Sequence, residues 1–136
     1  MLDCSAYVRL YSVRGVVVRN HSAMLARIFA PAQLGFSSQI ISIECDISNG
    51  LPACVVVGLA DKAVDEAKER VRAALRHAGL LVPPKRITMN LAPADVPKDG
   101  TGFDLGMAVA LLAATGHVFV DTSTMLFAGE LGLDGS

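Results

Sequence analysis

The sequence predicts an α+β domain, a two-layer sandwich in which helices pack on one face of a mixed sheet. Three observations predict it: segments in which apolar and polar residues alternate, segments in which apolar residues recur every three or four positions, and the order of the two kinds along the chain. The expected order is three strands, a helix, a strand, a helix and a last strand. A chain of 136 residues is long enough to bury one such core.

The first three strands are expected between residues 25 and 57. Leu25–Ala30 is predicted as an edge strand, and Gln39–Ile47 alternates apolar and polar residues as a strand with one buried face does. Asn49-Gly50 is the type of pair that most readily adopts positive φ in a tight turn, which predicts a hairpin. The apolar run Ala53–Val57 is expected to return as a central strand.

Asp61–Ala78 is predicted to be a helix, because its apolar residues form one stripe at helical spacing. Acidic residues near its start and basic residues near its end complement the helix dipole, and Gly79 is expected to end it. His77 is therefore interpreted as a helix-end residue and not as a catalyst.

The second half of the domain contains another alternating strand, Arg86–Leu91, and a mostly apolar helix, Asp104–Thr115, which is expected to be buried. Met125–Ala128 is predicted as the last strand. The following Gly129–Gly135 is typical of the start of a further hairpin, so we expect a domain that is incomplete at its C-terminal end.

Composition narrows the class of protein. Hydrophobic residues make up 52% of the chain, but no apolar run reaches the roughly 18–20 residues that cross a membrane. The net charge of −1 provides no long-range attraction for nucleic acid. Three cysteines without a CxxC pair (Cys4, Cys45 and Cys54) argue against a zinc site and favour a reducing compartment, so a cytoplasmic protein is expected.

Residues 1–23 differ from the rest of the chain, with three arginines, one acidic residue and no apolar stretch of signal-peptide length. We interpret them as a non-native or poorly ordered extension, with Met24 as the natural start and residues 24–136 as the domain.

The loop Pro97–Asp104 is the place where polar, flexible and helix-starting residues converge: Lys98, Asp99, Gly100, Thr101, Gly102 and Asp104. Backbone N–H groups at a helix start can bind an anion or stabilise an oxyanion. The same loop can be only a capping turn, with Asp104 as the acidic residue of the first turn. A nucleophilic pair of Thr101 and Lys98 lacks a third group to orient it. The chain has no P-loop string for a nucleotide phosphate.

Several motifs in order resemble the Mg-chelatase-like AAA+ ATPases of the ComM/YifB family, from Met24 to the end of the chain. They are Ser48–Pro52 (SNGLP), Val57–Leu59 (VGL), Lys68–Leu75 (KERVRAAL), Pro84–Pro93 (PKRITMNLAP), Ala94–Gly100 (ADVPKDG), Phe103–Leu105 (FDL) and Phe127–Leu131 (FAGEL). The resemblance implies the family's N-terminal Lon-protease-like domain, with a ribosomal protein S5 domain 2-like fold and truncated before the ATPase module.

The resemblance also bears on the loop, because Lon-type proteases carry their catalytic serine in a PKDGPSAG string. Pro97–Gly100 matches that string, but Thr101-Gly102 replaces its Pro-Ser pair, so glycine stands at the nucleophile position. Ala128–Glu130 matches a later strand of these proteases, and the chain ends before the partner lysine. We therefore expect no catalytic residue, and a degenerate site at Lys98, Asp99, Gly100, Thr101 and Gly102.

The function that the resemblance implies is a non-catalytic interaction or assembly domain next to an AAA+ motor. That motor would bind ATP and Mg, form a homo-oligomer such as a hexamer, and act on DNA by branch migration in natural transformation. This chain would hold no cofactor or metal, and no membrane would be a partner. Two alternatives remain open: a residual Lon-like peptidase using Thr101, and a DNA-binding module using Arg72, Arg76, Lys85 and Arg86.

Overall fold

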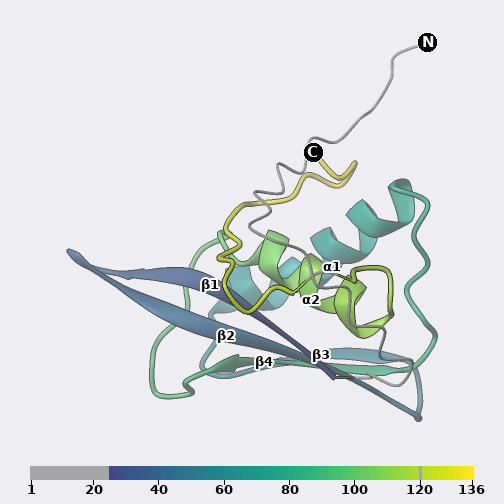
Figure 1. Ribbon diagram of the computed structural model, residues 1–136, viewed down its shortest axis with the longest axis horizontal. Helices are drawn as coiled ribbons and strands as arrows, with labels where there is room; N and C mark the ends of the chain where they lie inside the picture. The colour runs from purple at the N-terminus through teal and green to yellow at the C-terminus, as the bar shows by residue number, and fades with distance from the viewer. Residues whose placement is uncertain (1–24, 120) are drawn as a thin grey trace.

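The computed structural model describes residues 25–119 and 121–136, and it confirms the predicted two-layer α+β sandwich (Figure 1). Two helices cover one face of a four-stranded sheet. The elements are β1 (Leu25–Leu34), β2 (Ser37–Ser48), β3 (Ala53–Val57), α1 (Lys62–His77), β4 (Arg86–Ala92) and α2 (Asp104–Ala114). The interpretation of residues 1–23 lies outside the described residues.

The strand order is β1-β2-β4-β3, with antiparallel pairs except for the parallel pair of β3 and β4. The alternating residues fall on one face as predicted, so that Ile43 of β2 lies between Ile28 of β1 and Leu91 of β4. All three side chains are fully buried under the helices. The sheet's apolar face is therefore continuous from the predicted edge strand β1 across β2 and β4, the two strands predicted from alternation.

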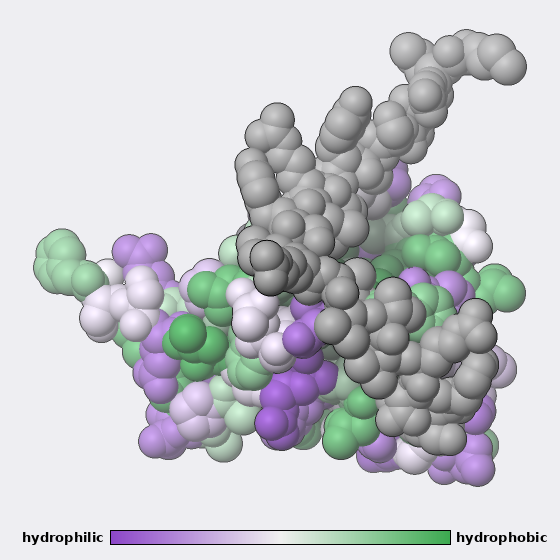
Figure 2. Space-filling model, viewed as in Figure 1, coloured by the Kyte–Doolittle hydropathy of each residue, from purple (hydrophilic) through white to green (hydrophobic). Residues whose placement is uncertain are grey.

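The predicted hairpin at Asn49-Gly50 is wrong, because β2 and β3 do not pair and β4 lies between them. The segment with Asn49-Gly50 takes the chain from β2 to the far side of the position of β4, and β4 enters this position after α1. Ala53–Val57 is consequently an edge strand and not a central one. The hairpin that does form joins β1 to β2 through Gly35-Phe36. It projects from the body, and Figure 2 shows an apolar group at its tip, where Phe36 is fully exposed.

Helix α1 begins and ends where the charge pattern and glycine predicted. The Asp61 carboxylate accepts a hydrogen bond from the Val64 N–H at 2.7 Å, and Gly79 follows the helix with a φ of +76°. His77 is confirmed as a helix-end residue, with its Nδ1 2.9 Å from the Ala73 carbonyl oxygen. Helix α2 packs so closely on β2 that a Cβ at Gly106 would lie 2.7 Å from Ile43 Cδ1.

The last predicted strand, Met125–Ala128, is present only as a single bridge between Leu126 and Phe29 of β1. The Phe127 N–H donates to the Phe29 carbonyl oxygen at 2.8 Å, and the chain then leaves the sheet for the start of α2. There the Leu105 N–H donates to the Gly129 carbonyl oxygen at 3.0 Å. Residues after Ala128 therefore bind the start of α2, whose N–H groups lack partners within the helix, and do not extend the strand along β1. No helix in the described ranges is long and apolar enough to cross a membrane.

Candidate functional site

The loop Pro97–Asp104 lies against the connection between β3 and α1. A bridge joins Lys98 to Ala60, the Lys98 N–H donates to the Leu59 carbonyl oxygen at 3.2 Å, and the Asp61 N–H donates to the Lys98 carbonyl oxygen at 3.0 Å. The two connections therefore form one unit at the N-terminal ends of both helices.

Lys98 is directed into this unit and away from solvent, with 1% of its surface exposed. Its Nζ donates to the Gly58 carbonyl oxygen at 2.6 Å and also to the Pro93 carbonyl oxygen. Burial lowers the pKa of its ammonium group. The side chain therefore holds the β3–α1 and β4–α2 connections together.

Gly58 makes that arrangement possible. Its φ is +106°, and a Cβ there would lie 2.0 Å from the Leu91 carbonyl oxygen. Any other residue would push the β3–α1 connection away from β4, together with the carbonyl oxygen that Lys98 binds.

Thr101 and Lys98 do not pair. The Thr101 hydroxyl donates to the Glu130 carboxylate at 2.8 Å, whereas the Lys98 ammonium group is used by the two carbonyl oxygens. Gly100 has a φ of +81°, and its N–H donates to the Asp61 carboxylate at 3.3 Å. Asp99 is exposed and makes no ion pair with a described residue.

Gly102 stands at the position that resembles a nucleophile position, and its surroundings are open. A Cβ at Gly102 would meet no atom within 4 Å, and its carbonyl oxygen accepts a hydrogen bond from the Gly129 N–H at 3.0 Å. Packing therefore does not require glycine here, in contrast to Gly58.

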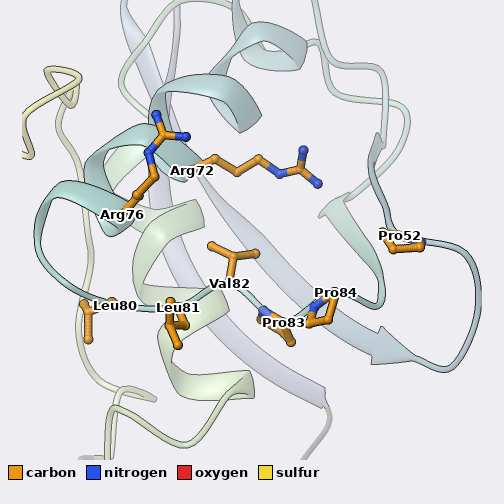
Figure 3. Close-up of a pocket in the computed structure, with 8 residues that line it drawn as sticks. All are labelled: Pro52, Arg72, Arg76, Leu80, Leu81, Val82, Pro83 and Pro84. Atoms are coloured by element: carbon orange, nitrogen blue, oxygen red, sulfur yellow. The ribbon is translucent and has the colours of Figure 1, made fainter.

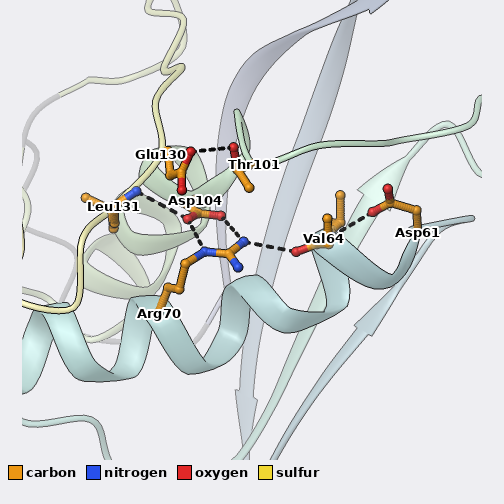
Figure 4. Close-up of polar contacts among 8 residues, drawn as sticks. Asp61, Val64, Arg70, Thr101, Asp104, Glu130 and Leu131 are labelled. Atoms are coloured by element: carbon orange, nitrogen blue, oxygen red, sulfur yellow. Dashed lines mark hydrogen bonds and ion pairs between the residues drawn. The ribbon is translucent and has the colours of Figure 1, made fainter.

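Asp104 is the centre of a polar network that ties both helices to the C-terminal segment (Figure 4). Its fully buried carboxylate accepts from Arg70 Nε at 2.6 Å, from the other Arg70 nitrogen at 3.0 Å and from the Leu131 N–H at 3.2 Å. Arg70 also donates to the Ala63 carbonyl oxygen at 3.0 Å. The hydrogen bond with Asp104 raises the pKa of Arg70.

Two N–H groups at the start of α2, where the sequence left anion binding open, donate to the chain itself. The Asp104 N–H donates to the Thr101 carbonyl oxygen at 3.3 Å, and the Leu105 N–H donates to Gly129. Asp104 does lie in the first turn, as the capping interpretation required, but its carboxylate binds Arg70 and the helix has no side-chain cap.

Arg70 is the site residue that the sequence interpretation missed. A signal was present: Arg70 lies three residues after buried Ala67 and four before buried Ala74, so it falls on the apolar stripe of α1. A cation on such a stripe needs a buried partner, and Asp104 is the one acidic residue in the apolar helix α2.

The arginines of the DNA-binding alternative lie elsewhere. Arg72 and Arg76 border a pocket of about 330 Å³ at the C-terminal end of α1 (Figure 3). The other lining residues are apolar: Pro52, Leu80, Leu81, Val82, Pro83 and Pro84. Lys85 and Arg86 follow directly in the sequence. None of these four cations forms an ion pair with a described residue.

The cysteines of the described residues lie in and against the core. Cys45 is fully buried, which raises its pKa to about 12, and Cys54 is half-buried. Across residues 25–119 and 121–136, no three metal-ligating side chains gather into a group that could hold a metal ion.

Comparison with known proteins gives a consistent family. The family model described as subunit ChlI of Mg-chelatase matches residues 43–136. The competence protein ComM of Haemophilus influenzae is 45% identical over 114 residues, which is 82% of this chain and 22% of ComM. The protein YifB of Salmonella typhimurium is 46% identical over 113 residues. The chain thus spans about a fifth of the length of these curated relatives, 22%.

Proposed function

Because this chain belongs to the Mg-chelatase-like family of ComM and YifB, as an N-terminal domain of that family, we propose that it is a non-catalytic assembly domain. The observation that carries the proposal is that three polar side chains of the loop Pro97–Asp104 are bound to other parts of the chain, while Asp99 is exposed. Lys98 binds two carbonyl oxygens, Thr101 binds Glu130, and Asp104 binds Arg70.

Catalysis needs groups with a different arrangement. A peptidase of the serine–lysine or threonine–lysine type requires a hydroxyl within hydrogen-bond reach of a base. The hydroxyl of Thr101 faces a carboxylate, and the buried ammonium group of Lys98 faces carbonyl oxygens. The geometry therefore supports a role in holding the fold over a residual peptidase.

The activity of a whole protein built around this domain is part of the same proposal. Such a protein would hydrolyse ATP with Mg in an AAA+ module, form a homo-oligomer in the cytoplasm and act on DNA, as the family resemblance implies. No P-loop string occurs in this sequence, so ATP and Mg would bind outside this domain. The name of ComM, a competence protein, agrees with a role in DNA uptake.

Sedimentation velocity tests the assembly role. A whole protein that contains this domain and the proposed AAA+ module is compared with a version that lacks residues 25–136. Both are measured with ATP and Mg. We expect the deletion to reduce the size of the oligomer, or to narrow the range of ATP concentrations over which the oligomer is stable. An unchanged oligomer distribution would overturn the proposal.

A further inference from the structure

We propose that copies of this chain associate head to tail, with the loop Pro93–Asp99 of one copy docked on the pocket beside Arg72 and Arg76 of the next. The proposal rests on the assembly role above and names the surfaces that perform it. We call the loop the acidic loop, and we call the pocket with Lys85 and Arg86 the basic pocket.

The basic pocket combines two features that fit an acidic, apolar segment. Arg72 and Arg76 are one helical turn apart on α1, and prolines line the other side of the pocket. Figure 3 shows the Arg72 side chain extending toward the Pro52 side, whereas the Arg76 side chain leaves the helix away from Pro83 and Pro84. No carboxylate lines the pocket. Guanidinium groups pair with carboxylates through two parallel hydrogen bonds, while the leucine, valine and proline walls bury apolar groups.

The acidic loop has the complementary composition, Pro-Ala-Asp-Val-Pro-Lys-Asp. Asp95 and Asp99 are exposed, and neither forms an ion pair with a described residue. The one cation of the loop, Lys98, turns its ammonium group inward to Gly58 and Pro93. The outward surface is therefore acidic, with exposed Pro93 and Pro97 beside the two carboxylates.

The two surfaces lie at opposite ends of the domain (Figure 1). The acidic loop follows the last residue of β4, whereas the basic pocket adjoins the first, and a strand of 7 residues separates its ends by about 20 Å. Helix α1 separates the two surfaces in the same way. Asp61, which precedes its first turn, accepts from the Gly100 N–H next to the acidic loop, whereas Arg72 and Arg76 lie toward the other end of the helix.

A contact between different surfaces at opposite ends cannot form within one copy. Between copies it is heterologous, so each copy offers one acidic loop and one basic pocket, and the contacts repeat until a ring closes or a chain extends. Single-stranded nucleic acid is the other polyanion to consider. The pocket has no aromatic side chain for base stacking, and beyond residue 24 nine basic residues face twelve acidic ones, so a second copy is the better fit.

A charge-reversal experiment tests the contact with two variants of this chain. R72E/R76E makes the pocket acidic, and D95K/D99K makes the loop basic. We expect the unmodified chain to associate with rising concentration in sedimentation velocity, less so at high salt. Each variant alone should associate about tenfold or more weakly than the unmodified chain. An equimolar mixture of the two should associate again, because the acidic pocket of one variant can bind the basic loop of the other.

The matched control is D46K/E66K, which changes the net charge by the same amount as D95K/D99K at exposed positions outside both surfaces. It should associate as the unmodified chain does. A chain that stays monomeric, or a mixture that fails to recover association, overturns the proposal. Tight binding of a single-stranded oligonucleotide that R72E/R76E abolishes, without self-association, also overturns it and assigns the pocket to nucleic acid. If the charge-reversal variants give none of these results, while deletion of the domain still reduces the oligomer size in the sedimentation experiment above, the assembly role stands. Only the contact between the acidic loop and the basic pocket is then wrong.

Discussion

Arg70 of α1 and Asp104 of α2 form an ion pair through two hydrogen bonds, of 2.6 and 3.0 Å, beneath the loop that resembles a protease active site. The carboxylate is fully buried and only 20% of the Arg70 side chain is exposed. Because a third bond reaches Leu131, the pair joins both helices to the C-terminal segment.

Asp104→Asn should therefore destabilise the domain by about 3 kcal/mol, because it leaves a largely buried guanidinium group without its counter-charge. Urea unfolding of the chain measures this. Asp65→Asn is the control, since its partner Lys68 forms an ion pair that is partly exposed, and it should cost about 0.5 kcal/mol or less. Equal effects of the two changes would refute the central position of Asp104.

Lys98→Met should destabilise the domain by about 2 kcal/mol at neutral pH, because two buried carbonyl oxygens lose their donor. The pH dependence has a definite sign. Burial lowers the pKa of Lys98 in the folded state from 10.5, so between the folded and unfolded values the unfolded chain binds more protons.

The stability contributed by Lys98 must therefore rise with pH in the window below 10.5. Urea midpoints of the unmodified chain and Lys98→Met, compared at several alkaline pH values, check this. A difference that stays constant or shrinks as pH rises would show that the ammonium group is not buried.

Gly102→Ser should fold as well as the unmodified chain, within about 0.5 kcal/mol, because the added side chain meets no neighbouring atom. It should also show no peptidase activity, since the Lys98 ammonium group is bound by carbonyl oxygens. Thermal unfolding and hydrolysis of a fluorogenic peptide measure the two outcomes. Activity in Gly102→Ser would mean that only the nucleophile is missing.

Gly58→Ala should be much more harmful, costing about 3 kcal/mol or more, because its Cβ would lie 2.0 Å from the Leu91 carbonyl oxygen at a φ of +106°. Gly79→Ala is the control: its φ is also positive, at +76°, but its surroundings are open. Similar losses of stability at the two positions, measured by urea unfolding, would contradict the close approach at Gly58.

Much of the fold could be predicted because local patterns determine it. Alternation placed Ile43 and Leu91 on the buried face, and helical spacing with Asp61 and Gly79 gave the bounds of α1. Strand order could not be predicted in the same way. The Asn49-Gly50 turn is compatible with a hairpin, and only the return of β4 beside β3 excludes it.

The candidate site was predicted in position but not in its contacts. The loop was found because glycines and polar residues precede a buried helix, yet the partners of its side chains come from distant parts of the chain. Lys98 is 40 residues from Gly58, and Asp104 is 34 from Arg70. Such pairs depend on how the two connections pack, which periodicity does not encode.

Hydrolysis of casein by this chain, with and without Thr101→Ala, tests most directly whether the polar groups of the loop Pro97–Asp104 hold the fold or perform chemistry. The structural role predicts no hydrolysis by either protein and the same oligomer size for both. Hydrolysis that disappears with Thr101→Ala, while the oligomer stays intact, would contradict it and make this domain a peptidase.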